Sequence, residues 1–318
     1  MPLTKHAATP KVALKNNSLA NKPQVLSSDA LQGGEDVGGP PSSRLRSGKR
    51  RGEDAIADYN PHEKYSAPPQ NTSGRPKFHL VWWNVQSKNN LLGTNSSKNE
   101  VVRNVGESIA GFFKNGCDAV FLIEVTHLHQ ELVAYVKDKV PNGINHYFNP
   151  NADRRQNVSR CSYLLLYGMD CEISEIEAVG QADVVKRPAL RFRHGDRHYY
   201  GVHLVAYKKK AWQEILDFTN ESNESNDTKA FVFGDVNHDV REKIGEFGEH
   251  KLLGHFKPIR MDGIEYTHSK GGMLDGAYTN TPGEALVYDP LPDYSFKPPN
   301  NLIKYCPPDH KPIGLKIY

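Results

Sequence analysis

Cysteine is scarce in this chain of 318 residues. The four cysteines stand far apart, at Cys117, Cys161, Cys171 and Cys306, with no CxxC pair and no His-Cys cluster. A structural zinc site is therefore not expected, and we interpret the cysteines as scattered thiols. The alternative is a pairing of Cys161 with Cys171 across neighbouring strands, which no other feature of the sequence supports.

Long hydrophobic runs are also missing. The longest apolar runs, "AVFLI" and "LLL", are far too short to cross a bilayer as helices. The first twenty residues, "MPLTKHAATPKVALKNNSLA", contain no apolar core of the length that a signal peptide needs. We expect a soluble protein without a membrane span, and any export would use a route that the sequence does not reveal.

Aromatic residues are nearly absent from residues 1–75, where Tyr59 and Tyr65 are the only ones. This region is rich in Pro, Ser, Asn and Gly, so it cannot bury enough apolar area to offset the entropy of ordering the chain. We predict a disordered N-terminal arm over 1–75 and one folded domain over 76–318. The net charge of +3 permits a polyanionic partner but does not require one.

A basic cluster lies inside the predicted arm, in "SRLRSGKRRGED". Its charges are Arg44, Arg46, Lys49, Arg50 and Arg51. One interpretation is a solvated charge run. The other is a nuclear-import signal or a basic arm that contacts nucleic acid.

The pattern changes at Phe78, where alternating and continuous apolar runs begin. "KNEVVRNVGESIAGFFKNG" predicts a helix that ends at Gly116 and buries one face, made of Val101, Val102, Val105, Ile109, Phe112 and Phe113. Two more helices are predicted over 209–222 and 239–250. Strands are predicted over 78–86, 117–125, 162–168, 171–178, 184–193, 198–207, 229–237, 273–278, 285–290 and 313–318. Many strands with few helices between them favour sheet packed on sheet, flanked by helices.

Polar residues recur at the ends of these strands. In "FVFGDVNHD" an apolar strand runs directly into Asp235 and Asn237. One such residue is usually a turn or a cap. The whole set, however, is of types that ligate magnesium or move protons: Asn84, Glu124, His203, Asp235, Asn237, Asp275, Asp309 and His310.

Together these residues have the chemistry of phosphate-ester cleavage. A hard cation needs oxygen ligands, which Glu124 and Asn84 can supply. A histidine held by a carboxylate has a fixed tautomer and raised basicity, so we expect His310 to pair with an acid such as Asp275. Because Asp235 and Asn237 are two apart, they point to one side and can orient water and phosphate.

The segments "WWN", "IE", "GVH", "GDVN", "LDGAY" and "PDHKPI" occur in an order that resembles the endonuclease/exonuclease/phosphatase superfamily, the deoxyribonuclease-I-like fold. The resemblance covers 78–318. It implies a four-layered α/β sandwich of two mixed sheets flanked by helices. It also implies magnesium, with Mn²⁺ and Ca²⁺ as alternatives. The implied roles are Asn84, Glu124 and Asp309 at the metal, His203 and His310 as the catalytic pair, Asp275 bonded to His310, and Asp235 with Asn237 placing nucleophile and phosphate.

Within that superfamily, "QADVVKRPALRFRHGDRHYYGVHLVA" is similar to the branch of cytolethal distending toxin B subunits. This likeness implies that Arg187, with Arg160 as a second residue, contacts the scissile phosphate. A solvated arginine on a strand is the alternative for each. The stretch "VSRCS" has no acid where pancreatic-type deoxyribonucleases carry a glutamate, which leaves the partner of His203 open. "GDVNHD" also lacks the arginine that follows the GDFN of the toxins.

These features favour a magnesium-dependent DNA endonuclease of low sequence specificity, acting as a genotoxin-like toxin or effector in another cell's nucleus. A phosphoinositide phosphatase is the first alternative, and a non-catalytic binding module is the second. Carrier subunits remain open. Basic residues expected near the site favour a long polyanion, since phosphate contacts carry no sequence information: Arg154, Arg155, Arg160, Arg187, Arg191, Arg193 and Lys208 to Lys210.

Overall fold

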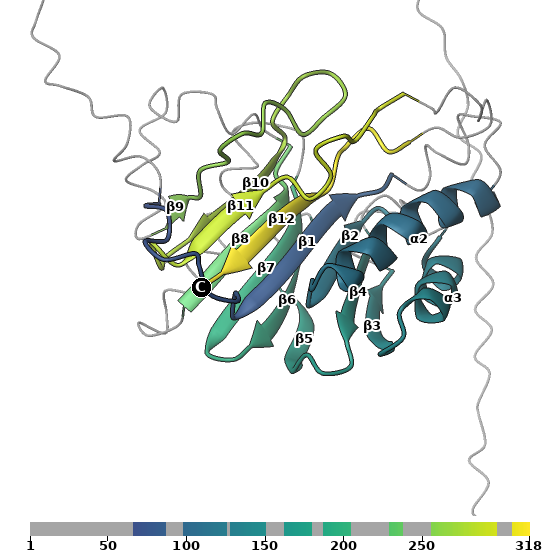
Figure 1. Ribbon diagram of the computed structural model, residues 1–318, viewed down its shortest axis with the longest axis horizontal. Helices are drawn as coiled ribbons and strands as arrows, with labels where there is room; N and C mark the ends of the chain where they lie inside the picture. The colour runs from purple at the N-terminus through teal and green to yellow at the C-terminus, as the bar shows by residue number, and fades with distance from the viewer. Residues whose placement is uncertain are drawn as a thin grey trace, which may run out of the picture. The chain divides into compact units, whose positions relative to one another are not determined.

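The computed structural model of the chain (Figure 1) describes most of the region from Ser66 to the C-terminal residue. The described residues are 66–86, 98–125, 128–150, 162–179, 187–204, 229–237, 256–297 and 307–318. Residues 1–65 of the predicted arm, with the basic cluster, lie outside them. Both predicted helices, over 209–222 and 239–250, also lie outside them. The arm's disorder and its boundary at residue 75 stay predictions.

Two six-stranded sheets form the framework. The first has the order β11-β12-β1-β2-β4-β3, and the second has the order β5-β6-β7-β8-β10-β9. The strands of the first sheet are β1 (Phe78–Asn84), β2 (Ala119–Ile123), β3 (Ile144–Asn149), β4 (Tyr163–Gly168), β11 (Ala285–Tyr288) and β12 (Ile313–Ile317). Those of the second are β5 (Ile173–Val179), β6 (Ala189–His194), β7 (Arg197–His203), β8 (Lys229–Asp235), β9 (Lys257–Pro258) and β10 (Asp275–Thr279).

Both sheets are mixed. Among the described strands, β1 pairs with β2 and β7 pairs with β8 in parallel, and the other pairs are antiparallel. Each parallel pair occupies the middle of its sheet, where strands buried on both faces are expected to be continuously apolar. The sequences "FHLVWW" and "AVFLI" have that character, and every residue of β1 and β2 is buried.

The two sheets pack face to face around an aromatic core. Trp82 of β1 lies 5.6 Å from Phe233 of β8, centroid to centroid, and Phe121 of β2 lies 5.3 Å from the same ring. Successive strand residues point to opposite faces, so Trp82 enters this core while Trp83 points to the other side of the sheet. The predicted sandwich of two packed mixed sheets with helices is confirmed.

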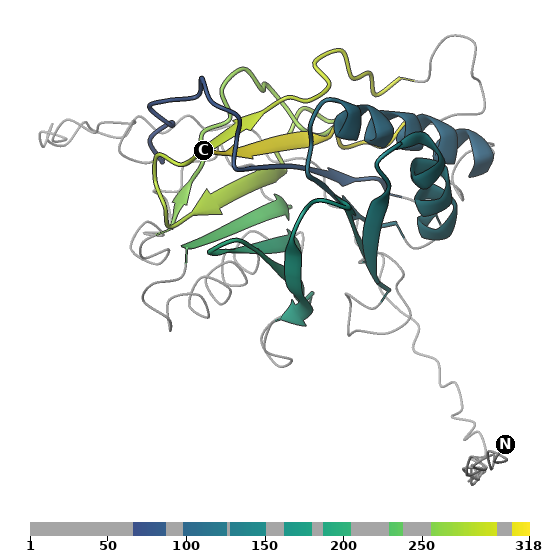
Figure 2. The ribbon, with the colours of Figure 1, turned by 60° about the horizontal axis from the view of Figure 1, so that its bottom comes forward.

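Helices α2 (Lys98–Lys114) and α3 (His129–Lys139) cover the outer face of the first sheet (Figures 1 and 2). The face predicted for α2 is the buried one, with Phe113 partly buried at its edge. The helix ends just before Gly116, whose φ of +80° no helix continues. Helix α3 and strand β3 were not predicted, and no helix in the described part of the chain is long and apolar enough to cross a membrane.

The cysteines that the structure describes are free thiols. Cys117 is buried and Cys171 is partly exposed. Burial raises the pKa of the Cys171 thiol to about 12, and burial also raises the pKa of Cys117 well above its ordinary value. Both are therefore neutral at physiological pH, as expected of inert thiols. Cys161, the alternative partner of Cys171, lies outside the described residues.

The first described residue, Ser66, pairs with the chain at the end of strand β9. Its backbone N–H donates to the carbonyl of Pro258 at 2.8 Å, and it forms an isolated parallel bridge with Ile259. Ser66 is almost fully buried. A truncation that spares the domain should therefore start before this residue.

We expect a protein of residues 65–318 to melt at the same temperature as the full chain, because the composition of the removed segment cannot form a core. Thermal unfolding followed by circular dichroism measures this. The shorter protein 76–318, which lacks the Ser66 bridge, should lose about 1 kcal/mol of unfolding free energy. A large loss in the 65–318 protein would show that part of the arm belongs to the folded domain.

Candidate active site

The polar residues that follow the strands gather at one edge of the two sheets. Asn84 ends β1, and Glu124 follows the parallel strand β2. In the second sheet, His203 ends β7 directly opposite Asp235 at the end of the parallel strand β8. Strand β10 runs antiparallel and begins at Asp275, opposite Asp235. This topology brings together polar side chains from the ends of five strands, as the parallel pairing predicts.

Asp235 is the centre of the cluster, and it is almost fully buried. Its Oδ2 accepts a hydrogen bond from Asn84 Nδ2 at 2.9 Å, a contact that joins the two sheets. The same oxygen lies 3.5 Å from His203 Nε2 and 3.6 Å from His310 Nε2. Its Oδ1 accepts the backbone N–H of Asn237 at 2.9 Å. Two histidines thus face one carboxylate oxygen.

His310 is paired with Asp275, as the sequence predicted. Nδ1 of His310 lies 2.8 Å from Asp275 Oδ2, and both residues are buried. The backbone carbonyl of His310 accepts the indole N–H of Trp83 at 2.8 Å, which fixes the chain at this point. Burial acts to lower the pKa of His310, but the carboxylates of Asp275 and Asp235 outweigh it and raise the pKa to about 10. The imidazole is therefore held as a cation between two acids.

Glu124 and His203 lie together on the other side of Asp235. Glu124 Oε1 is 3.6 Å from His203 Nε2, and the backbone N–H of His203 donates to the hydroxyl of Tyr163 at 3.0 Å. Burial and the nearby charge of Asp235 raise the pKa of Glu124 to about 7, against an opposing effect of Arg187. Nε2 of His203 therefore faces two carboxylates, those of Glu124 and Asp235.

Arg187 and Asn237 share the carbonyl of Leu204, to which Arg187 Nη1 and Asn237 Nδ2 each donate at 2.8 Å. This places Arg187 beside the site. Arg191 and Arg193 instead form ion pairs with Glu177 and Glu175 of β5, so their charges are compensated there. Arg160 and the other predicted basic residues, Arg154, Arg155 and Lys208 to Lys210, lie outside the described residues.

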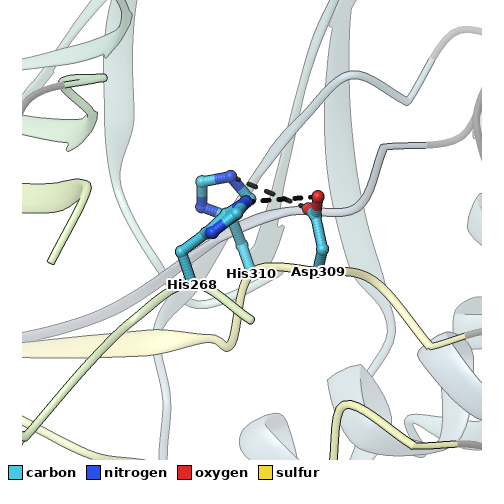
Figure 3. Close-up of side chains that lie close together, drawn as sticks. All are labelled: His268, Asp309 and His310. Carbon is cyan, nitrogen blue, oxygen red and sulfur yellow. Dashed lines mark ion pairs between the residues drawn. The ribbon is translucent and has the colours of Figure 1, made fainter. Parts of the chain in front are cut away.

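Asp309 contacts His268, a residue that was not predicted from the sequence. Nε2 of His268 is 3.3 Å from Asp309 Oδ2, and Nε2 of His310 is 3.8 Å from Asp309 Oδ1 (Figure 3). Ligand atoms of His268, Asp309 and His310 all lie within 4.8 Å of one another, so this trio has the spacing of a metal site. Burial acts to raise the pKa of Asp309, but the bond from His268 and the charge of His310 hold it below its ordinary value.

His268 was not predicted as a site residue because it follows no predicted strand. Its sequence signal is the polar turn "THSKGG" just before "MLDGAY". That turn looks like an ordinary loop. An antiparallel bridge with His310, a residue distant in sequence, brings His268 to the site.

Backbone strain is concentrated at the same edge. Of the four non-glycine residues with positive φ in the described part of the chain, Gln86, Glu124 and Asn237 belong to these strand ends. Such conformations cost about 1–3 kcal/mol each and persist where the surrounding structure imposes them, often at active sites. Gly234 adds a close approach: with φ +137°, a Cβ there would lie 2.1 Å from the carbonyl oxygen of Val202.

The fold of this edge and its two sheets can be compared with known proteins. No protein-family model matches the sequence, and no curated protein matches it either. Solved structures do match, and they define the class: the chain has the fold of the endonuclease/exonuclease/phosphatase proteins, the deoxyribonuclease-I-like fold. The resemblance predicted from the sequence motifs is confirmed at the level of structure.

Three of these structures show how far the likeness extends. The Haemophilus ducreyi cytolethal distending toxin is matched at 18% identity with a TM-score of 0.50, over 76% of this chain and 98% of that one. The biologically active subunit of a cytolethal distending toxin is matched at 14% identity and 0.53, over 77% and 99%. An endonuclease/exonuclease/phosphatase family protein from Leptotrichia buccalis is matched at 15% identity and 0.54, over 76% and 99%. At sequence identities this low, the structural matches establish the fold alone.

Gly234→Ala should be strongly destabilising, because the added Cβ would collide with the backbone of β7 and φ is unfavourable for alanine. We expect the unfolding free energy to fall by at least about 2 kcal/mol in a urea titration. Gly111→Ala is the matched control, since Gly111 lies in α2 with no atom within 4 Å of an added Cβ. It should be neutral or gain up to about 1 kcal/mol. Equal stability of the two variants would contradict the close approach of β7 and β8.

Proposed function

We propose that this protein is a magnesium-dependent phosphodiesterase that cleaves DNA with little sequence specificity. The observation that carries the proposal is the position of Asp235 Oδ2, 3.5 Å from His203 Nε2 and 3.6 Å from His310 Nε2. Two imidazoles and one carboxylate converge there, and the second histidine is held by Asp275. The fold is that of proteins described as endonucleases, exonucleases and phosphatases, which agrees with this chemistry.

Each residue of this group has a role in hydrolysis. Asp235, with Oδ1 held by the N–H of Asn237, orients a water and accepts its proton as the water oxygen bonds to phosphorus. His310, kept cationic by Asp275, donates from Nε2 to the charge that builds on the phosphoryl oxygens. The ester P–O bond then breaks, and the leaving oxygen takes up a proton from solvent water, while the proton on Asp235 returns to solvent. His203 is placed to stabilise the same charge from the other side.

The residues present fit a hard divalent cation. Asp309 Oδ1 is buried and accepts no hydrogen bond by distance and angle, while burial beside Asp235 raises the pKa of Glu124 to about 7. Carboxylate oxygens so poorly compensated are the ligands that Mg²⁺ prefers, and Mn²⁺ and Ca²⁺ take the same oxygens. Glu124, Asp309 and the amide oxygen of Asn84 would hold the ion. When bound, it would polarise the phosphate and stabilise its charge.

The choice of DNA rests on the likeness to structures described as cytolethal distending toxins and on the basic segments of the sequence. Arg187 would contact the scissile phosphate, and Arg160 would add a second contact. We further propose that the protein acts as a toxin or effector in a nucleus, which the cluster from Arg44 to Arg51 would help it to enter. Carrier subunits like those of a holotoxin would then be partners.

A plasmid-nicking assay tests the histidines. His203→Ala and His310→Ala should each lower the rate of DNA cleavage by at least ~10²-fold, as expected for loss of a group that moves protons or stabilises charge. His146→Ala is the matched control, because His146 is an exposed histidine of β3. It should cleave at the parent rate. A folded His203/His310 double variant with parental activity would refute the assignment.

The same assay should be run beside phosphate release from phosphoinositide vesicles. We expect cleavage of plasmid and no phosphate release from the lipid. Phosphate release without nicking would identify the protein as a phosphoinositide phosphatase of the same fold. Absence of both activities in the presence of magnesium would favour a non-catalytic binding module.

The cation is tested by removal and by substitution. EDTA should abolish nicking, and added Mg²⁺ should restore it. Glu124→Gln should raise the magnesium concentration needed for half-maximal rate at least ~10-fold, because the cation loses a charged oxygen ligand. Glu172→Gln, at an exposed position just before β5 and at the end of the second sheet opposite His203, should titrate like the parent. Activity that persists in EDTA would exclude a required cation.

A further inference from the structure

His268 lies on a turn that the backbone ties to the segment carrying Asp309 and His310. The N–H of Ser269 donates to the carbonyl of Asp309 at 2.7 Å, and the N–H of Lys311 donates to the carbonyl of Thr267 at 2.9 Å. The N–H of His268 itself donates to Gly272 at 3.0 Å. The imidazole is buried and packs edge to face on His310, with ring centroids 4.9 Å apart. Its position relative to Asp309 is therefore fixed by backbone.

The two ring nitrogens of His268 face different partners. Nδ1 accepts the backbone N–H of Lys270 at 3.1 Å. A nitrogen that accepts a hydrogen bond carries no proton, so in the neutral ring the hydrogen sits on Nε2. Nε2 faces Asp309 Oδ2 at 3.3 Å and is thus the donor of this contact.

This arrangement argues against His268 as a metal ligand, although the trio in Figure 3 has the spacing for one. A histidine that binds a metal through Nε2 almost always donates its Nδ1–H to a carbonyl or a carboxylate. His310 has that geometry, with Nδ1 on Asp275. In His268 the corresponding nitrogen meets an N–H donor instead. Loss of the Nε2 proton to a metal would leave Nδ1–H facing another N–H.

The contact has a consequence for Asp309. One carboxylate oxygen, Oδ2, faces Nε2 of His268, and the other, Oδ1, is buried and accepts no hydrogen bond by distance and angle, although the Gln86 side chain also acts on this carboxylate. Rotation of the carboxylate would exchange the two oxygens and break the bond to His268. The contact with His268 therefore opposes this rotation and favours the orientation in which Oδ1 faces the site.

We propose that His268 is a positioning residue, whose Nε2–H holds Asp309 so that Oδ1 is presented to the cation. The inference rests on the proposed function, because it assigns Asp309 to the magnesium site. Partners of this kind orient the groups that bind a metal, and their loss typically weakens metal affinity or activity by about 10-fold to 100-fold. His268 then affects the cation through Asp309 alone.

The test compares His268→Ala with His268→Gln, whose amide nitrogen can replace the Nε2–H donor, and uses Ser269→Ala at the exposed neighbouring position as control. Magnesium is titrated by calorimetry without DNA, and again in the nicking assay. We expect His268→Ala to weaken magnesium about 10-fold or more in both, with most of the rate recovered at saturating magnesium. His268→Gln and Ser269→Ala should resemble the parent.

A second readout does not depend on activity. Long-range ¹H–¹⁵N spectra of the metal-free protein at alkaline pH should show His268 as the Nε2–H tautomer, and adding magnesium should leave it so. The Nδ1–H tautomer would overturn the proposal. So would a glutamine variant as weak as the alanine variant, or zinc binding that both variants abolish, since these identify His268 as a ligand.

Failure of the proposed function has a different signature. If the parent protein binds magnesium but cleaves neither DNA nor lipid phosphate, the function is wrong. The calorimetric comparison of the variants still decides the role of His268 in that case. A parent protein that binds no magnesium would overturn both.

Discussion

The burial of the Asp235 carboxylate at the junction of the two sheets is the constraint on which the rest of this site depends. A buried charge is tolerated only when hydrogen bonds and opposite charges surround it. Here they come from three directions: Asn84 from the other sheet, the N–H of Asn237 from the chain just beyond, and the two histidines. The sheets must keep their relative position for these partners to meet. The aromatic core between Trp82, Phe121 and Phe233 supplies that rigidity.

The electrostatics of the edge are unbalanced in favour of acids. Glu124, Asp235, Asp275 and Asp309 gather around three histidines, His203, His268 and His310, and the environment raises the pKa of Glu124 to about 7 and that of His310 to about 10. Environments that shift titratable groups in this way are common at catalytic centres. A divalent cation would neutralise an excess of carboxylate charge in a buried site. The excess of buried carboxylates that disfavours folding at this edge is therefore suited to bind a divalent cation.

Two histidine–aspartate pairs at this edge differ in direction, although their residue types are the same. His310 donates Nδ1–H to Asp275 and turns Nε2 toward Asp235, whereas His268 accepts at Nδ1 and turns Nε2 toward Asp309. The difference comes from the group that each Nδ1 faces: the side-chain carboxylate of Asp275 in His310, and the backbone N–H of Lys270 in His268. Hydrogen-bond direction, which distance alone does not reveal, separates these two imidazoles, and the different roles proposed for them follow from it.

Much of this arrangement could be predicted from the sequence, because its signals are local. Apolar runs ending in "N", "E", "H" and "GD" place polar groups at strand ends, and the amphipathic period over 98–114 predicts α2. The sequence order of these segments also indicated the fold. Helix α3 and strand β3 were missed because the hydrophobic pattern is weak there: β3 is mostly half-exposed, and α3 buries only a few residues.

Apart from the pairing of His310 with Asp275, tertiary structure alone decided which polar groups meet. Asn84 and Asp235 are 151 residues apart, and their bond exists only because two sheets pack with these strand ends in register. The pairing of His268 with Asp309 likewise depends on a bridge between a turn and the chain before β12. Residue types and local periodicity determine which groups are available and on which element they lie. Proximity, burial and hydrogen-bond direction arise from long-range packing, and they set the pKa values and the protons on which the chemistry depends.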